Sequence, residues 1–168
     1  ELRRILTPLV PDIEVLGLND VEQYPEPRET EPDFAGNALL KARACVKATG
    51  LPSLADDSGL CVDALNGMPG VLSARWAGVS KAEGADAANN RLLLAQLADT
   101  PAERRGARFE CAMAFVLPDG REFIETGAMH GVILDSERGL GGFGYDPLFG
   151  PDQLGVSSAE LSAEVKDE

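Results

Sequence analysis

An alternation of apolar and other residues near the middle of the chain is the feature that most constrains its fold. Apolar side chains occupy every second position from Phe109 to Leu117, which is the period of a strand with one buried face. Pro118-Asp119-Gly120 follows at once and is a strong turn signal. With further apolar runs at 123–126 and 129–134, residues 108–134 are predicted to form an antiparallel meander.

Helical signals flank this meander. Asp33 can cap a helix over 34–49, which Gly50 and Pro52 would end, and Asp86 can cap a second helix that buries Leu93. The other expected elements are the tail of a helix at 1–6, strands at 13–16, 53–55 and 60–64, loops at 19–33, 66–84 and 139–157, and a short helix at 158–166. The pattern predicts an α/β fold, with a central mixed, partly antiparallel sheet flanked by helices, in a single domain over residues 1–168.

The charge balance excludes one broad class of partner. A net charge of −13 argues against a general nucleic-acid binder, which needs a basic face to cover many phosphates. One small phosphorylated ligand needs only a few local cations and a metal, so this class stays open. The apolar runs are too short to span a bilayer, and no signal peptide is visible. Cys45, Cys61 and Cys111 are expected to be buried free thiols in a reducing cytosol.

Two adjacent carboxylates, Asp56 and Asp57, follow a short apolar run and precede Ser58-Gly59. Carboxylates at the end of a buried strand are well placed to hold a divalent cation, and a glycine beside them lets the backbone approach a ligand closely. An acidic turn between two strands, without further function, explains the same pattern.

A second segment, residues 139–149, places four glycines around Phe143, Tyr145 and Asp146. An exposed aromatic ring in such a loop can stack on a base, and a carboxylate can accept hydrogen bonds from a base or a ribose. A structural loop whose aromatic rings fill the core is the alternative. The glycine spacing does not match a dinucleotide-binding fingerprint.

Other candidate residues carry weaker signals. His130, the one histidine, lies in a predicted strand and is interpreted as structural, so a Ser-His-Asp mechanism at Ser58 is not expected. Arg104 and Arg105 are expected in a solvated turn. Arg75 could line a ligand cleft.

Taken together, these segments resemble the inosine triphosphate pyrophosphatase family, also called the non-canonical purine NTP pyrophosphatases, over essentially the whole chain and in the same order. The matching segments are Asn37-Ala38-x-x-Lys41-Ala42, Leu54-Ala-Asp-Asp-Ser-Gly-Leu60, Val62-Asp-Ala-Leu65, Gly67-x-Pro-Gly-Val-x-Ser-Ala-Arg-Trp-Ala-Gly78, Asn89-Asn-Arg-Leu-Leu93, Pro118-Asp-Gly120, Gly142-Phe-Gly-Tyr-Asp-Pro-Leu-Phe149, and Ala159-Glu-Leu161 followed by Lys166.

The resemblance implies hydrolysis of ITP, dITP and XTP to the monophosphate and pyrophosphate, with Mg²⁺, in a cytoplasmic homodimer whose nucleotide cleft lies between two lobes. By position, Asp57 matches the Mg²⁺ ligand and proton acceptor that helps a water attack the α-phosphorus. The matches to substrate contacts are Ser58, the triphosphate contact Lys41, the base-binding residues Phe143, Gly144, Tyr145 and Asp146, with Phe143 as the stacking ring, and Lys166.

The chain departs from the family in three places. A Thr/Ser-x-Asn-x-x-Lys phosphate loop would precede Glu1, and a Ser-His-Arg motif would follow Glu168. Gly36 stands where the family carries a metal-binding glutamate, for which Glu29, Glu31, Asp33 or Asp56 could substitute. These departures keep open a nucleotide-binding protein without catalysis. A pyrophosphatase for other modified or pyrimidine nucleotides is a third hypothesis.

Overall fold

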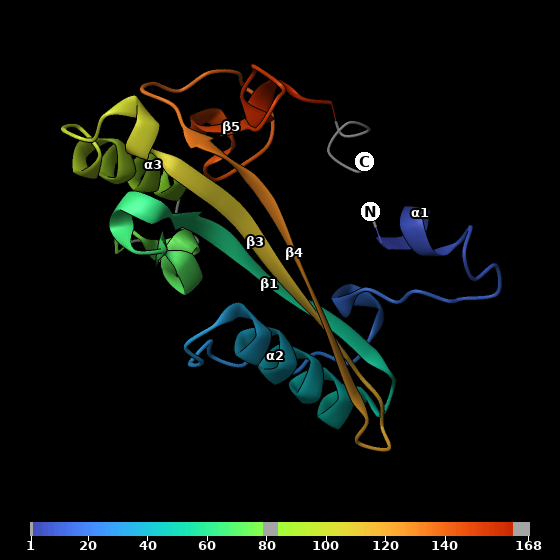
Figure 1. Cartoon of the computed structure of the whole chain (residues 1–168). Helices are drawn as coiled ribbons and strands as arrows, with labels where there is room; N and C mark the ends of the chain where they lie inside the picture. The colour runs from blue at the N-terminus through green and yellow to red at the C-terminus, as the bar shows by residue number, and fades with distance from the viewer. Residues whose placement is uncertain (1, 79–83, 163–168) are drawn as a thin grey trace.

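The computed structural model describes residues 2–78 and 84–162, and in this part of the chain the centre is a five-stranded sheet of order β2-β1-β3-β4-β5 (Figure 1). The strands are β1 Ser53–Val62, β2 Met68–Pro69, β3 Gly106–Val116, β4 Glu122–Ile133 and β5 Phe149–Pro151. The α-helices are α1 Leu2–Leu6, α2 Phe34–Thr49 and α3 Ala85–Gln96. Short 3-10 turns are η1 Leu18–Asp20, η2 Asp63–Leu65, η3 Gly70–Arg75, η4 Ala102–Arg104, η5 Asp146–Leu148 and η6 Ser158–Glu160.

The predicted meander is confirmed as a long hairpin of β3 and β4, in which the two predicted strands after the turn are one strand. The expectation of a mixed sheet is wrong, since all pairings among the described strands are antiparallel. The reason lies in the connection from β1 to β3. Val62 at the end of β1 pairs with Ala107 at the start of β3, so β3 runs back along β1.

Strand β1 runs through the acidic pair, and the prediction of two strands at 53–55 and 60–64 is therefore wrong. Its ten residues pair with β3 from Ser53–Val116 to Val62–Ala107. Aspartate, serine and glycine have poor strand propensity, but a full-length partner strand overrides such weak local preferences. Ile13 and Leu16, by contrast, are exposed in irregular backbone, so the strand predicted at 13–16 does not form.

Helix α2 has the predicted bounds and the predicted ends. The Asp33 carboxylate accepts a hydrogen bond from the Gly36 amide at 2.7 Å, and Gly50 adopts the left-handed conformation that ends the helix. Helix α3 begins after Gly84, so Asp86 lies in its first turn and is not its cap.

The two hydrophobic clusters of the core lie on opposite faces of the sheet. Helix α2 covers one face of the lower half of the sheet, as Figure 1 shows, whereas α3 and the chain from β5 onward lie at the upper end. The α2 cluster comprises Phe34, Ala38, Ala42, Cys61, Ala112, Ala114 and Val116. The upper cluster comprises Leu60, Val62, Leu93, Leu97, Ala107, Ile133, Tyr145, Leu148 and Phe149. Cys61 and Leu60 are neighbours in β1 and so point to opposite faces.

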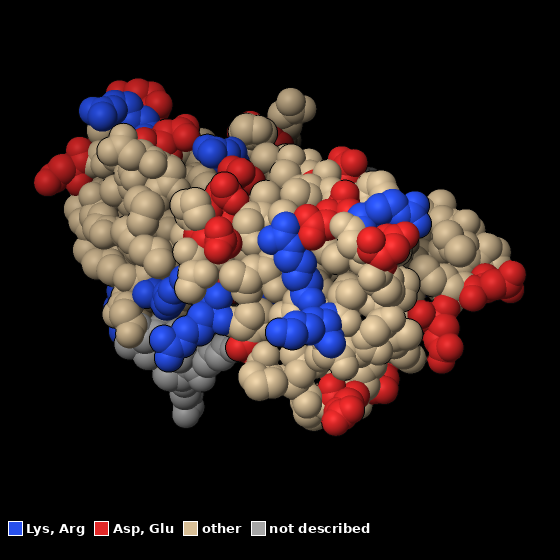
Figure 2. All heavy atoms as spheres, turned by 90° about the horizontal axis from the view of Figure 1, so that it is seen from below, with Lys and Arg blue, Asp and Glu red and all other residues tan. Residues whose placement is uncertain are grey.

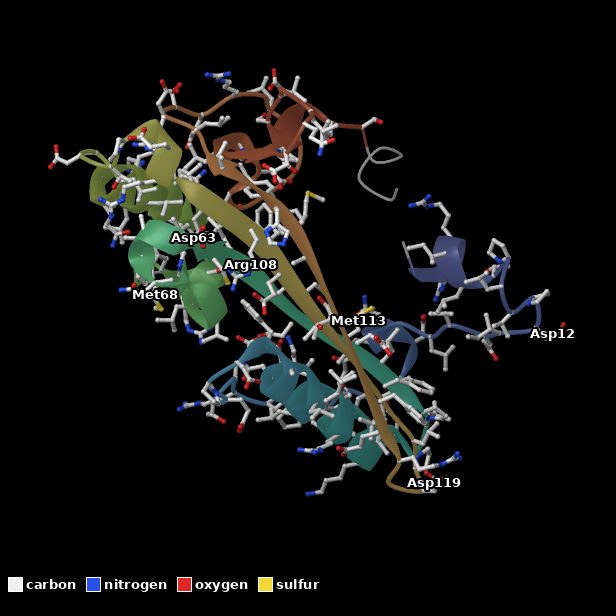
Figure 3. The ribbon with its side chains drawn as sticks, viewed as in Figure 1. Asp12, Asp63, Met68, Arg108, Met113 and Asp119 are labelled. Carbon is white, nitrogen blue, oxygen red and sulfur yellow. The ribbon has the colours of Figure 1, made fainter. Side chains whose placement is uncertain are left out.

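The prediction of a solvated turn is wrong for Arg105, which is half-buried. Its guanidinium donates to the carbonyl oxygens of Leu97 at 2.7 Å, Thr100 at 3.1 Å and Leu134 at 2.9 Å. These bonds tie the end of α3 to the segment that follows β4. Figure 3 shows Asp119 at the hairpin tip and Arg108 beside Asp63 at the other end of the sheet.

The surface and the cysteines agree with an ordinary globular chain. Figure 2 shows basic and acidic side chains interspersed on one face rather than a continuous basic surface. Among the described residues, no helix has the length and apolar character needed to cross a membrane. Cys45, Cys61 and Cys111 are free, but only Cys61 is fully buried, and burial raises the pKa of its thiol.

Candidate functional site

Five polar side chains form a charged cluster between α2, β1 and η3. Lys41 Nζ lies 2.9 Å from Asp57 Oδ1 and 3.2 Å from Glu29 Oε1, and therefore bridges two carboxylates. Asn37 Nδ2 donates to Asp57 Oδ2 at 3.1 Å, and Arg75 Nη1 donates to Glu29 Oε2 at 3.1 Å. We call Glu29, Asn37, Lys41, Asp57 and Arg75 the charged cluster.

Local structure explains why these side chains meet. Asn37 and Lys41 are four residues apart, one turn of α2, so both face the same strand. Asp57 lies on the face of β1 that α2 covers. Asn37 Oδ1 accepts a hydrogen bond from the Glu31 amide at 3.0 Å, which fixes the loop that carries Glu29.

The cluster shifts the pKa of each ionisable group at its centre. Burial raises the pKa of Asp57, and the hydrogen bonds from Lys41 and Asn37 limit that rise. Burial would also raise the pKa of Glu29, but hydrogen bonds from Arg75 and Lys41 outweigh it and lower the pKa. Burial would lower the pKa of Lys41, but its two carboxylate partners outweigh burial and raise it. Lys41 and Glu29 therefore both stay charged at neutral pH.

The cluster fits a metal ion that takes only two protein carboxylates and completes its coordination with phosphate oxygens and water. Asp57 and Glu29 already share one cation, the Lys41 ammonium. No group of three or more His, Cys, Asp and Glu suited to a metal occurs in residues 2–78 and 84–162. Mg²⁺ commonly takes one or two carboxylates and completes its shell with phosphate oxygens and water, so this donor set suits Mg²⁺ bound together with a phosphorylated ligand.

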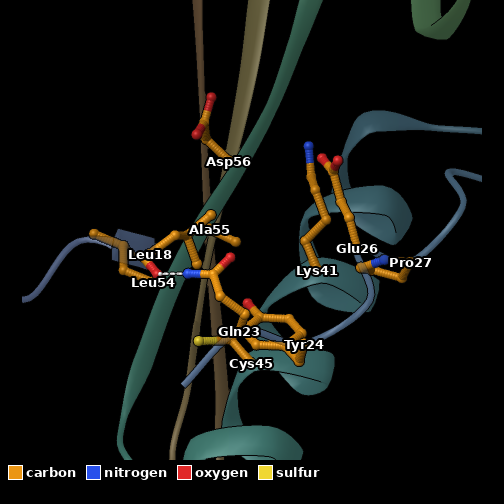
Figure 4. Close-up of a pocket in the computed structure, with 10 residues that line it drawn as sticks. All are labelled: Leu18, Gln23, Tyr24, Glu26, Pro27, Lys41, Cys45, Leu54, Ala55 and Asp56. Carbon is orange, nitrogen blue, oxygen red and sulfur yellow. Dashed lines mark hydrogen bonds between the residues drawn. The ribbon is translucent and has the colours of Figure 1, made fainter. Parts of the chain in front are cut away.

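Of the carboxylates that the sequence offered as substitutes for a glutamate at position 36, Glu29 is the one that lies in the charged cluster. A Cβ at Gly36 would lie 2.6 Å from Glu31 Cβ, so this position has no room for a longer side chain without a shift of Glu31. Asp33 caps α2. Asp56 lines a smaller pocket of about 420 Å³ together with Lys41 and Glu26, and Figure 4 shows its carboxylate directed away from these two side chains.

A larger cavity, of about 550 Å³, lies on the other face of β1. Its lining includes Ser58 together with Phe143, Gly144, Tyr145 and Asp146. We call these last four residues the aromatic segment. The two segments that the sequence singled out therefore do meet in space.

The two aromatic residues of that segment have different environments. Phe143 is 85% exposed, whereas Tyr145 is 4% exposed and packs in the upper core. The Tyr145 hydroxyl donates to the Ser73 carbonyl at 2.8 Å. The interpretation that both rings fill the core thus holds for Tyr145 only, and Phe143 is available to stack on a ligand.

Asp57 and Ser58 point to opposite faces of β1, so the charged cluster and the cavity are two compartments, and neither Asp57 nor Lys41 lines the cavity. Turn η3 joins the compartments. Its Ser73 Oγ accepts from the Leu60 amide at 2.9 Å, and its Arg75 reaches Glu29. Among the described strands, β2 pairs with β1 at residues 61–62 alone, which leaves that edge of β1 unpaired beside Asp57 and Ser58.

Sequence reasoning found the centre of each compartment but not its supports. It weighed Glu29 and Arg75 only as possibilities, it gave Asp86 only the role of a helix cap, and it assigned no role in the site to Ser73 or Asn90. The four-residue spacing of Asn37 and Lys41 was a usable signal, since it places both on one helix face. Lys166, expected to bind substrate, lies outside the described residues.

Comparisons with known proteins agree with this geometry. A model of the Ham1 family matches residues 1–168. The chain is 56% identical to the dITP/XTP pyrophosphatase of Corynebacterium efficiens, over 99% of this chain and 83% of that protein, and 57% identical to that of Nocardia farcinica, over 99% and 80%.

Two solved structures share its fold. The crystal structure of a nucleoside-triphosphatase, a dITP/XTP pyrophosphatase from Mycobacterium abscessus, aligns with a TM-score of 0.85 at 53% identity, over 99% of this chain and 84% of that one. The Ham1 protein of Staphylococcus aureus aligns with a TM-score of 0.77 at 39% identity, over 97% and 76%.

Proposed function

Because this chain belongs to the Ham1 family, we propose that it hydrolyses dITP, ITP and XTP to the nucleoside monophosphate and pyrophosphate. The observation that carries the proposal is the pairing of a cavity that exposes Phe143 with a cluster that joins Lys41 to two carboxylates, on either side of one strand. The first compartment suits a flat base and the second suits phosphates with a metal.

In this proposal the nucleotide lies around the unpaired edge of β1. The base stacks on Phe143 in the cavity, and Tyr145 and Asp146 form the wall behind it. The phosphates reach the charged cluster, where Lys41 and Arg75 neutralise part of their charge. Ser58 lines the cavity and contacts the substrate there. The extent of the cavity, about 550 Å³, supports a ligand of nucleoside size.

Asp57 and Glu29 would hold Mg²⁺, which when bound neutralises charge on the phosphates and on the departing pyrophosphate. The protein's own groups do the rest. Lys41 exchanges a carboxylate for a phosphate oxygen, and Asn37 keeps the Asp57 carboxylate oriented. Asp57 accepts the proton of the water that attacks the α-phosphorus. Gly36 leaves the loop before α2 close enough for Glu29 to take part.

The proposal includes the setting in which the enzyme works. We place it in the cytoplasm, as a homodimer of a single-domain chain that cleanses the nucleotide pool. Turnover without preference for deaminated purines would favour a pyrophosphatase for other modified or pyrimidine nucleotides. Binding without turnover would favour a nucleotide-binding protein on the same scaffold.

The decisive experiment measures pyrophosphate release from ITP, dITP and XTP against ATP, GTP and a pyrimidine triphosphate, with Mg²⁺ and with chelator. We expect turnover of the first three alone, and only with metal. Asp57→Asn should retain the fold and lose at least about 100-fold in kcat. Asp56→Asn, the neighbouring carboxylate on the opposite face, is the matched control and should retain activity. Equal turnover of all the triphosphates would reject the substrate assignment.

A further inference from the structure

Two side chains of helix α3 bind the backbone of Gly144 in the aromatic segment, one at its amide and one at its carbonyl. Asp86 Oδ2 accepts a hydrogen bond from the Gly144 amide at 2.8 Å. Asn90 Nδ2 donates to the Gly144 carbonyl at 3.2 Å. Asp86 and Asn90 are four residues apart, so they lie on one side of α3 and bracket Gly144 from the same direction.

Gly144 is the residue at which such a restraint has most effect on Phe143. It has a φ of +58°, a left-handed conformation, and follows directly after the exposed ring. Before the ring, Gly142 also has positive φ, and a Cβ there would collide with the Asp146 carboxylate. Within the segment, the Phe143 amide donates to Asp146 Oδ2 at 3.3 Å and the Phe143 carbonyl accepts from the Asp146 amide at 3.2 Å. Left-handed glycines are conformationally permissive, so the bonds from α3 to Gly144 add a restraint from outside the segment.

The helix that supplies these partners is itself fixed to the rest of the site. Asn89 is buried, donates to the Ser73 carbonyl at 3.2 Å and accepts from the Ala77 amide at 2.8 Å. The Ser73 carbonyl also accepts a hydrogen bond from the Tyr145 hydroxyl, and Ser73 Oγ accepts one from the Leu60 amide. Helix α3 is therefore connected through Ser73 to strand β1, and its bonds to Gly144 fix the position of Phe143 relative to that strand.

Asn90 carries a further sign that its amide serves the aromatic segment. It is 3% exposed, and its Oδ1 is the one buried side-chain oxygen or nitrogen without a hydrogen-bond partner among the described residues. An unpaired buried oxygen destabilises a fold. An apolar side chain would avoid that cost but could not donate to Gly144.

We propose that Asp86 and Asn90 are positioning residues which hold Phe143 in place over the cavity and thereby set affinity for the base. The inference rests on the proposed function, because it assumes that a base stacks on Phe143. It assigns no contact with phosphate to either residue, since the charged cluster lies on the other face of β1.

The test compares Asp86→Ala and Asn90→Ala with the wild-type enzyme. Each should raise KM for dITP about tenfold, as expected for loss of one hydrogen bond that positions a binding group, with kcat changed by less than about threefold. Inhibition by pyrophosphate should be unchanged, because pyrophosphate occupies only the charged cluster. Asp86→Asn keeps an acceptor oxygen and should restore most of the affinity.

A second readout does not depend on activity. Hydrogen exchange at the Gly144 amide should become faster in Asp86→Ala. Asp99→Ala, which removes an exposed carboxylate beyond the end of α3, is the matched control and should leave exchange and KM unchanged.

The outcomes separate this inference from the proposed function. If the wild-type enzyme turns over dITP and both alanine variants keep its KM, the inference is wrong. It is also wrong if the variants weaken pyrophosphate inhibition as much as dITP binding, since that would indicate general loosening. If the wild-type protein does not turn over dITP, the proposed function fails, while faster Gly144 exchange would still support the role of Asp86 in holding the segment.

Discussion

Two adjacent aspartates show how strongly a residue's role depends on the face it occupies. Asp56 and Asp57 have the same side chain, but alternation along β1 sends them in opposite directions. Asp57 is 8% exposed and is bound by Lys41 and Asn37, whereas Asp56 is exposed and lines the smaller pocket. Glu29 comes from a loop 28 residues earlier, yet it shares the Lys41 ammonium with Asp57.

Glu29→Gln should make stability less sensitive to acid. The pKa of Glu29 is lowered from 4.5 on folding, because hydrogen bonds from Arg75 and Lys41 outweigh the effect of burial. A carboxylate of this kind stabilises the fold above its unfolded pKa, and that contribution is lost as the pH falls through the lower pKa of the folded state. The free energy of unfolding of the wild-type protein should therefore fall more steeply than that of the variant as the pH is lowered below about 5.

Urea unfolding at a series of pH values measures this difference. Glu31→Gln, two residues along the same loop, is the control and should follow the wild-type protein. Parallel curves for the wild-type and Glu29→Gln proteins would show that the bonds to Arg75 and Lys41 contribute nothing to folding. Glu29→Gln should also bind Mg²⁺ with nucleotide more weakly than the wild-type protein does, and calorimetry can measure that difference.

At the scale of elements, β1 and η3 determine how the site is built. The strand carries residues of both compartments, and η3 packs so closely against it that a side chain at position 59 has no room. A Cβ on Gly59 would lie 2.5 Å from Ser73 Oγ and 2.6 Å from the Gly70 carbonyl oxygen. The second of these atoms belongs to the backbone, so it cannot move aside without a shift of η3 itself.

Gly59→Ala should destabilise the protein by about 2 kcal/mol, in the range typical of overpacking a well-filled site. Gly127→Ala in β4 is the matched control, because a Cβ there meets no atom within 4 Å. That substitution should be neutral or slightly stabilising. Thermal or urea unfolding of both variants measures the difference, and equal stabilities would mean that η3 adapts freely to the added methyl group.

At the scale of the whole molecule, the two hydrophobic clusters on opposite faces support two compartments that meet at one strand edge. The α2 cluster anchors the helix that carries Asn37 and Lys41, and the upper core anchors Tyr145. A ligand that occupies both compartments would connect the two halves of the structure. Its binding should therefore stabilise the fold as a unit.

A non-hydrolysable dITP analogue with Mg²⁺, at about 100 times its dissociation constant, should raise the melting temperature by about 5–10 °C. At the same ligand concentration, Lys41→Ala and Phe143→Ala should each reduce the shift, because each removes a contact in one compartment. Lys47→Ala, an exposed position on the same helix as Lys41, should give the full shift. A full shift in either of the first two variants would exclude that compartment from binding.

By itself the sequence determined the elements whose signals are local. The hairpin of β3 and β4 and both ends of α2 follow from period-2 alternation, a turn motif and capping residues, each of which acts within a few neighbours. It also located Asp57, Lys41 and Phe143 through motifs. Local propensity failed at β1, where a polar segment became one strand because β3 offered a partner along its whole length.

Only the tertiary structure decided which of these residues share a compartment. Face alternation in β1 separated Asp57 from Ser58, and packing between distant segments brought Glu29 and Arg75 to Lys41 and brought Asp86 to Gly144. Arg105, expected in solvent, became a bridge to three carbonyl groups for the same reason. Such contacts depend on which distant segments pack together, and a local sequence pattern does not determine that packing.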